Sequence, residues 1–219
     1  MNMLAPPHQQ MAGARPLPTA EQIYCAIRAD ATNLAAADPF TAHVIACALT
    51  IGLSDALERG DTLSSALGLD RAGLEALTAQ WAPNARQFFD LQAEPQELFL
   101  DEEEAQLHEL LARFKSDTTP LCAWMISIVA RRAMSPRHLW QDLGLIERSE
   151  LTKLMAQWFP ALASANVDNM KWKKFFYRKL CELEGFSLCA APTCRECGDF
   201  DNCFGAEDGA SMLARLSQR

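Results

Sequence analysis

Four cysteines lie within fifteen residues near the end of the chain. They are Cys189, Cys194, Cys197 and Cys203, spaced C-x4-C-x2-C-x5-C, and they make up half of the eight cysteines in the sequence. Thiols this dense serve as ligands of a metal or an iron–sulfur cluster, as a disulfide knot, or as a redox relay. The glycine, proline, aspartate and asparagine residues among them favour turns, which would let four sulfur atoms converge on one centre.

The gaps between these cysteines differ in length, and their lengths help to decide which metal or cluster the cysteines bind. Structural zinc sites usually combine two C-x2-C pairs, whereas this segment has one such pair, flanked by gaps of four and five residues. The first three cysteines match the C-x4-C-x2-C run of plant-type ferredoxins, although the fourth follows much sooner here. The spacing therefore favours an iron–sulfur cluster, with zinc as the second interpretation and a disulfide or redox use behind both.

Composition limits the partners and the compartment. The chain has 219 residues, 49% of them apolar and 22% charged, which suits one domain whose core needs no disulfides. Its formal net charge of −8 argues against a general nucleic-acid binder. Residues 1–20 hold four prolines and no continuous apolar stretch, and the apolar stretch Leu121–Ala130 is too short to span a bilayer. We expect a cytoplasmic protein with no membrane partner, where disulfides are disfavoured.

The elements that must position the cysteines are predicted to be helices. Alanine and leucine recur at helical spacing, and β-branched residues are sparse. Asp38 and Pro39 mark the start of one helix. Another is expected over Asp101–Phe114, where the acidic first turn suits the positive end of the helix dipole.

Two segments of this helical body resemble each other. Residues 67–69 (LGL) lead to residues 80–83 (QWAP), and residues 143–145 (LGL) lead to residues 157–160 (QWFP). Each copy predicts a turn, an amphipathic helix, and a stop at Trp and Pro. Before the two copies lie segments expected to form buried helices, residues 40–58 and 121–134. We predict an all-α fold, a helical bundle of two related helical hairpins with a C-terminal cysteine-rich metal-binding loop. The expected parts are a disordered leader (1–20), a helical domain (21–188), the cluster-binding loop (189–205) and a C-terminal tail (206–219).

A basic aromatic segment, MKWKKFFYRKLCELE over residues 170–184, comes directly before the cysteine loop. Five of the chain's twenty basic residues lie between Lys171 and Lys179. On a helix, Cys181 would fall next to a basic face, and nearby cations would favour its thiolate. The segment is either an amphipathic helix with solvated lysines or a surface that attracts anions beside the cysteines. The side chains of that surface would be Lys171, Lys174 and Arg178.

The remaining cysteines and histidines have structural explanations. Three cysteines lie among apolar residues of expected helices and are predicted to pack in the core. They are Cys25, Cys47 and Cys122. We expect His43 to be structural and His108 to be exposed, whereas His138 is either a helix cap or a metal ligand. A phosphate-binding glycine loop and a Gly-x-Ser-x-Gly elbow are both missing from the sequence, so a conventional enzyme is not expected.

Three parts of the sequence, in this order, resemble the NifQ family of nitrogen-fixation proteins. They are residues 138–145 (HLWQDLGL), residues 172–178 (WKKFFYR) with Cys181 after them, and the cysteine motif with Pro192, Phe204 and Gly205. The resemblance covers about residues 120–207 and is weaker before them. The WKKFFYR stretch combined with this cysteine spacing is far more specific than either part alone.

The resemblance implies a function that spacing does not supply. NifQ-like proteins bind a molybdenum–iron–sulfur cluster of the cubane type and donate molybdenum to assembly of the nitrogenase iron–molybdenum cofactor. By position, Cys189, Cys194, Cys197 and Cys203 would be the cluster ligands, with the molybdenum corner either bound by a thiolate or open for exchange. Cys181 and His138 are accessory candidates.

The implied partners are molybdate or a molybdenum–sulfur species, attracted by Lys171, Lys174 and Arg178, and the scaffold and reductase proteins of cofactor assembly. From the residues alone, two alternative functions remain: an iron–sulfur electron carrier and a zinc-stabilised interaction module.

Overall fold

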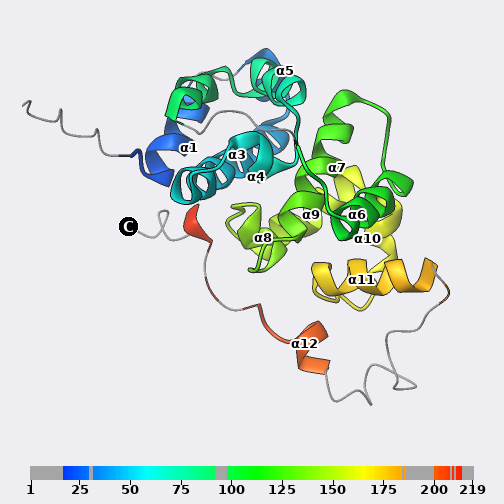
Figure 1. The fold of residues 1–219 in the computed structure, drawn as a ribbon. Coiled ribbons are helices and arrows are strands. Elements are labelled where there is room, and N and C mark those ends of the chain that lie inside the picture. The colour runs from blue at the N-terminus through cyan, green and yellow to red at the C-terminus, as the bar shows by residue number, and fades with distance from the viewer. Residues whose placement is uncertain are drawn as a thin grey trace, which may run out of the picture.

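The computed structural model describes residues 17–29, 32–91, 98–183, 185, 200–207, 209 and 211–213. Within these residues the chain forms α-helices and one 3-10 helix, and it contains no strand (Figure 1). The predicted all-α class is therefore confirmed. Cys189, Cys194 and Cys197, and with them most of the predicted cysteine loop, lie outside the described residues. The predicted boundaries of the leader, helical domain, loop and tail stay predictions.

The helices follow one another along the chain in two similar sets. The first set is α1 (Ala20–Ala29), α2 (Asn33–Ala37), α3 (Pro39–Arg59), α4 (Leu63–Leu67), α5 (Arg71–Trp81) and the 3-10 helix η1 (Pro83–Leu91). α6 (Glu102–Arg113) connects it to the second set. That set is α7 (Pro120–Ala133), α8 (Leu139–Asp142), α9 (Arg148–Trp158) and α10 (Pro160–Ala165), followed by α11 (Trp172–Leu183) and α12 (Phe200–Phe204).

The central helix of the first set is α3, which begins where the sequence predicted. Asp38 occupies its N-cap and accepts a hydrogen bond from the Thr41 N–H at 3.1 Å, and Pro39 opens its first turn. α3 alone, among the described helices, has the length and apolar composition that a membrane span needs. It is longer than the Leu121–Ala130 stretch considered above, and 83% of its apolar window is buried inside the protein. It supplies much of the helical core.

The internal repeat predicted from sequence is confirmed by the backbone. α5 and α9 both contain eleven residues and both end at a tryptophan, Trp81 and Trp158. The following residue has nearly the same conformation in both copies, with φ −148° and ψ 59° at Ala82 and φ −134° and ψ 56° at Phe159. A proline comes next in each copy and starts the next helical segment, as its fixed φ favours.

The glycine of each LGL turn packs against the long helix of the other copy. Gly68 and Gly144 both have left-handed backbones, with φ of 65° and 73°. A Cβ atom on Gly68 would lie 2.9 Å from Cβ of Arg131 in α7, and one on Gly144 would lie 2.8 Å from the Cys47 carbonyl oxygen in α3. Such reciprocal contacts are what two packed copies of one motif produce, and they require glycine at both positions.

Two expectations about single residues were wrong. Cys47 and Cys122 are buried as predicted, but Cys25 is exposed, because α1 buries Ile23 and Ile27 and Cys25 lies between them on the other side. His108 is half-buried rather than exposed. Its Nε2 atom lies 3.4 Å from the Ser127 hydroxyl of α7, and burial lowers its pKa. His43 has structural contacts, as expected: Tyr24 on α1 and Glu150 on α9.

Candidate functional site

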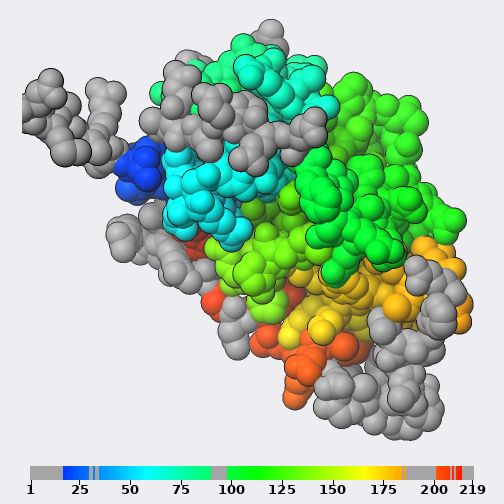
Figure 2. Space-filling view, viewed as in Figure 1, coloured from blue at the N-terminus to red at the C-terminus, as the bar shows by residue number. Residues whose placement is uncertain are grey.

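The basic aromatic segment forms α11, which packs against α6 and buries Trp172, Phe175 and Phe176. Lys171 directly precedes this helix and connects it to α12. Its backbone N–H donates a hydrogen bond to the Cys203 carbonyl oxygen at 2.8 Å, and its Nζ donates to the Asp201 carbonyl oxygen at 3.0 Å. Figure 2 shows the orange surface of α12 beside the yellow surface of the segment that leads into α11. The fourth cysteine of the motif therefore lies at the N-terminal end of the basic helix.

The two described cysteines of this region lie toward opposite ends of α11. Cys203 on α12 contacts Lys171, whereas Cys181 belongs to the last turn of α11. Ten residues of helix separate those two ends, which is about 15 Å along the axis. Both cysteines are partly exposed. Within the described residues, no group of three or more His, Cys, Asp or Glu side chains could hold a metal ion.

A pocket of about 370 Å³ lies beside α12, and most of its charged residues are basic. Its walls come from the start of α8, the start of α11, and the chain from α12 to residue 207. The charged and titratable residues of this cationic pocket are Arg137, His138, Lys171, Lys173, Lys174 and Glu207.

The pocket contains two of the three residues predicted to attract anions. Lys171 and Lys174 line it, whereas Arg178 does not and bonds to Glu182 one turn further along α11, at 3.0 Å. Lys173 and Arg137 line the pocket although the sequence analysis did not select them. A signal for them was present: Asp142 is an acidic residue in the largely apolar segment HLWQDLGL, and such a residue needs cationic partners when buried.

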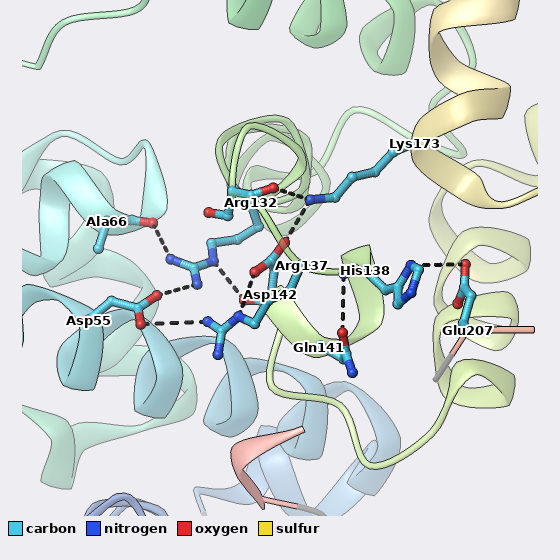
Figure 3. Close-up of polar contacts among 10 residues, drawn as sticks. Asp55, Ala66, Arg132, Arg137, His138, Gln141, Asp142, Lys173 and Glu207 are labelled. Carbon is cyan, nitrogen blue, oxygen red and sulfur yellow. Dashed lines mark hydrogen bonds and ion pairs between the residues drawn. The ribbon is translucent and has the colours of Figure 1, made fainter. Parts of the chain in front are cut away.

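Asp142 holds two of these cations in position. It is fully buried, and its two carboxylate oxygens accept hydrogen bonds from Arg137 Nε at 3.0 Å and Lys173 Nζ at 2.6 Å (Figure 3). Lys173 also donates to the Ser135 carbonyl oxygen. Burial lowers the pKa of Lys173, and the neighbouring Asp142 carboxylate opposes that shift. α11 is thereby fixed to the turn before α8 by charged side chains.

A buried arginine, Arg132, extends this network into the first helical copy. Arg132 of α7 donates to Asp55 of α3 at 2.5 Å, to the Asp142 carbonyl oxygen at 2.6 Å and to the Ala66 carbonyl oxygen at 3.3 Å. Arg137 also lies 3.6 Å from Asp55. Figure 3 shows these side chains converging between α3, α7 and α8. Carboxylates from both copies thus orient the arginines behind the pocket.

His138 and Glu207 also line the pocket. His138 occupies the N-cap position of α8, one of the two roles expected for it, and its N–H donates to the Gln141 side chain at 3.2 Å. Its Nδ1 lies 3.7 Å from Glu207, whose other carboxylate oxygen lies 3.4 Å from Arg148 Nε. These contacts hold the chain that follows α12 against α8 and α9.

A family model described as NifQ matches residues 44–205 of this chain. The chain belongs to the NifQ family. The match includes both helical copies, α11 and the four-cysteine motif, so the resemblance seen in the sequence is confirmed. NifQ proteins have a role in nitrogen fixation and are associated with molybdenum handling.

Individual relatives are similar over most or about half of the chain. The "Protein NifQ homolog" of Sinorhizobium fredii (strain NBRC 101917 / NGR234) is 40% identical over 174 residues, which are 78% of this chain and 75% of the relative. "Protein NifQ" of Rhodobacter capsulatus is 38% identical over 76% of this chain and 91% of its own length. "Protein NifQ" of Azotobacter vinelandii is 46% identical over 47% and 52% of the two chains. No solved structure matches this chain.

Proposed function

We propose that this protein carries molybdenum for assembly of the nitrogenase iron–molybdenum cofactor, as a molybdenum–iron–sulfur cluster bound by the four cysteines. The proposed ligands are Cys189, Cys194, Cys197 and Cys203. The main support is the attachment of Cys203 to the start of α11, beside the cationic pocket. Family membership supports the identity of the metal.

Thiolates suit this cargo for chemical reasons. They are soft ligands that bind iron–sulfur clusters well, and they must be deprotonated to do so. Lys171 contributes a cation close to Cys203, because its Nζ bonds to Asp201, two residues before that cysteine. A neighbouring positive charge stabilises a thiolate and any anionic cluster that it binds.

A carrier must also release its metal, and the position of Cys203 is compatible with release. α12 has only five residues, and Cys203 is partly exposed. Lys171 donates two of the hydrogen bonds that hold α12 to the helical body, and Glu207 anchors the chain after it. A short, partly exposed element opens locally at a lower free-energy cost than the buried helices of the core. The pocket residues of α8 and α11, in contrast, belong to the helical body.

Metal analysis of anaerobically purified protein tests the proposal. We expect molybdenum together with several irons in the natural protein, and loss of both metals when the four cysteines are replaced by serine. Cys25→Ser is the matched control, because Cys25 is an exposed cysteine on α1 and should be dispensable for metal binding. Iron without molybdenum would instead indicate an electron carrier, and zinc in a colourless sample would indicate an interaction module. Retention of molybdenum in the four-serine variant would refute the assigned ligands.

A further inference from the structure

The cationic pocket has a surplus of positive charge in a protein whose formal net charge is −8. Six cationic side chains line it or join the network behind it, against three carboxylates. The cations are Arg132, Arg137, Arg148, Lys171, Lys173 and Lys174. The carboxylates are Asp55, Asp142 and Glu207. A local surplus that opposes the sign of the whole chain attracts small anions to this place.

Two lysines of the pocket have hydrogen-bonding capacity left for a ligand. Within the described residues, no carboxylate forms an ion pair with Lys171 or Lys174. Lys171 Nζ donates to one carbonyl oxygen, and an ammonium group has three protons to donate. Lys174 is exposed, and among the described residues it forms no hydrogen bond or ion pair. These are the donors that an entering anion would meet first.

Two further cations are held in place before any ligand arrives. Asp142 fixes Arg137 and Lys173 through hydrogen bonds of 3.0 and 2.6 Å. Glu207, the carboxylate in the wall, lies close to both His138 and Arg148, which offsets its repulsion of an anion. Because these side chains are already ordered, binding would cost little conformational entropy.

The backbone of α11 adds a third source of attraction. Lys171 is its N-cap residue, since the Phe175 N–H donates to the Lys171 carbonyl oxygen, and Lys173 and Lys174 in its first turn line the pocket. α11 has twelve residues, and the N-terminus of such a helix presents partial positive charge and free N–H groups. The pocket thus combines ordered cations, free lysine donors and a helix N-terminus.

We propose that this pocket is an oxyanion site, separate from the cysteines, that binds a tetrahedral dianion of the molybdate class. A volume of about 370 Å³ holds such an ion together with water, each water taking ~30 Å³ in the liquid. The identity of the metal rests on the proposed function, whereas the anion chemistry rests on the pocket itself. Because Cys203 is attached to Lys171, the bound oxyanion would lie beside the ligands that later take up its metal.

Equilibrium dialysis with molybdate tests this site without the thiols. The protein to use is the full chain with the four motif cysteines replaced by serine. We expect it to bind molybdate, and we expect sulfate, another tetrahedral dianion, to compete, whereas chloride at equal ionic strength should compete weakly. Adding K171Q and K174Q should weaken binding at least about tenfold, since two charge-assisted hydrogen bonds are lost.

Lys115 and Lys153 provide the matched control. Both are lysines outside the pocket, so K115Q/K153Q changes the net charge by the same amount. Its affinity for molybdate should stay within about twofold of the parent, because screening at physiological salt weakens distant charges. The proposal is overturned if the four-serine protein does not bind molybdate. It is also overturned if K171Q/K174Q and K115Q/K153Q weaken binding equally, or if chloride competes as well as sulfate. Such failures would leave the cluster test above unaffected, because that test measures metals held by the cysteines.

Discussion

The two helical copies share a backbone plan but differ in the turn between the long helix and the short one. In the first copy, residues 60–62 form this turn, and the Thr62 side chain caps α4 by accepting a hydrogen bond from the Ser65 N–H. In the second copy, residues 134–138 form it, and Arg137 and His138 line the cationic pocket. Both copies therefore pack their helices in the same way, but only the turn of the second copy provides residues to the pocket.

The first copy still contributes to the pocket from behind. Asp55 of α3 pairs with Arg132 and lies close to Arg137, both of which belong to the second copy. In this comparison, the first copy supports the charged side chains from behind, and the second copy carries pocket residues. Changes in the charged network, in the reciprocal glycines and in the helix caps test this division.

Loss of the Asp55 carboxylate should have the largest effect on stability. D55A leaves Arg132 buried with carbonyl partners but no counter-charge, and breaking one partner of a buried pair costs about 3–5 kcal/mol. Urea unfolding followed by circular dichroism measures this cost. E75A is the control, because it breaks an exposed i,i+4 pair with Arg71 that contributes about 0.3–0.5 kcal/mol. Equal costs for the two variants would mean that the first copy does not support the charged network.

Alanine at the reciprocal glycines should have the next largest effect. G68A and G144A each force a left-handed backbone on alanine and push its Cβ into the other copy. The two effects should together lower the free energy of unfolding of each variant by about 2–5 kcal/mol. Gly60 is also left-handed, with φ 66°, but nothing lies within 4 Å of its Cβ position. G60A should therefore cost only about 1–2 kcal/mol. If all three variants lose the same unfolding free energy, the reciprocal packing of the copies is not a source of stability.

Removal of a helix N-cap should have the smallest effect on stability. A carboxylate cap and a hydroxyl cap should differ in how that effect depends on pH. D38A and T62A each remove an N-cap hydrogen bond, to Thr41 and Ser65 respectively, and should cost about 1 kcal/mol at pH 7. Burial raises the pKa of Asp38, but hydrogen bonds from Thr41, Gln157 and Phe40 together outweigh it, so the net pKa is lowered. The Asp38 contribution is thus present above its unfolded pKa of ~3.9 and is lost as pH falls through the lower folded value.

The pH series therefore distinguishes the two caps. The difference between D38A and the parent should shrink on acidification below about pH 4, where the carboxylate becomes protonated. Thr62 does not titrate, so the T62A difference should persist over the same range. A D38A difference that stays constant down to pH 2 would contradict the role of the ionised carboxylate at the start of α3.

The sequence predicted those features of the fold that depend on neighbouring residues. The LGL turns, the tryptophan–proline stops and the helix starts at Asp38 and Asp101 are local patterns, and the structure confirms them. Asp55 and Arg132 were missed because they are 77 residues apart, and each alone resembles a surface charge. Exposure of Cys25 was missed because an apolar sequence context does not show which side of a peripheral helix is covered.

The site was predictable to a smaller extent. Lys171 and Lys174 were selected from the basic segment, but Lys173 was not, since its orientation depends on Asp142, 31 residues earlier in the chain. Arg137 and Glu207 reach the pocket through turns whose paths no periodic pattern indicates. The assignment of Cys189, Cys194 and Cys197 as ligands stays a prediction, because these residues lie outside the described part of the chain.

The molybdenum and iron contents of anaerobically purified variants test the central claim most directly. K171Q/K174Q should retain most of its iron and lose most of its molybdenum relative to K115Q/K153Q. The four cysteines and the backbone hydrogen bond from residue 171 to Cys203 are intact in this variant, whereas the oxyanion site is not. The four-serine variant should lose both metals. Two results would contradict a carrier in which a cationic pocket delivers the metal to a thiolate site. One is an equal molybdenum content in K171Q/K174Q and K115Q/K153Q, and the other is molybdenum that persists in the four-serine variant.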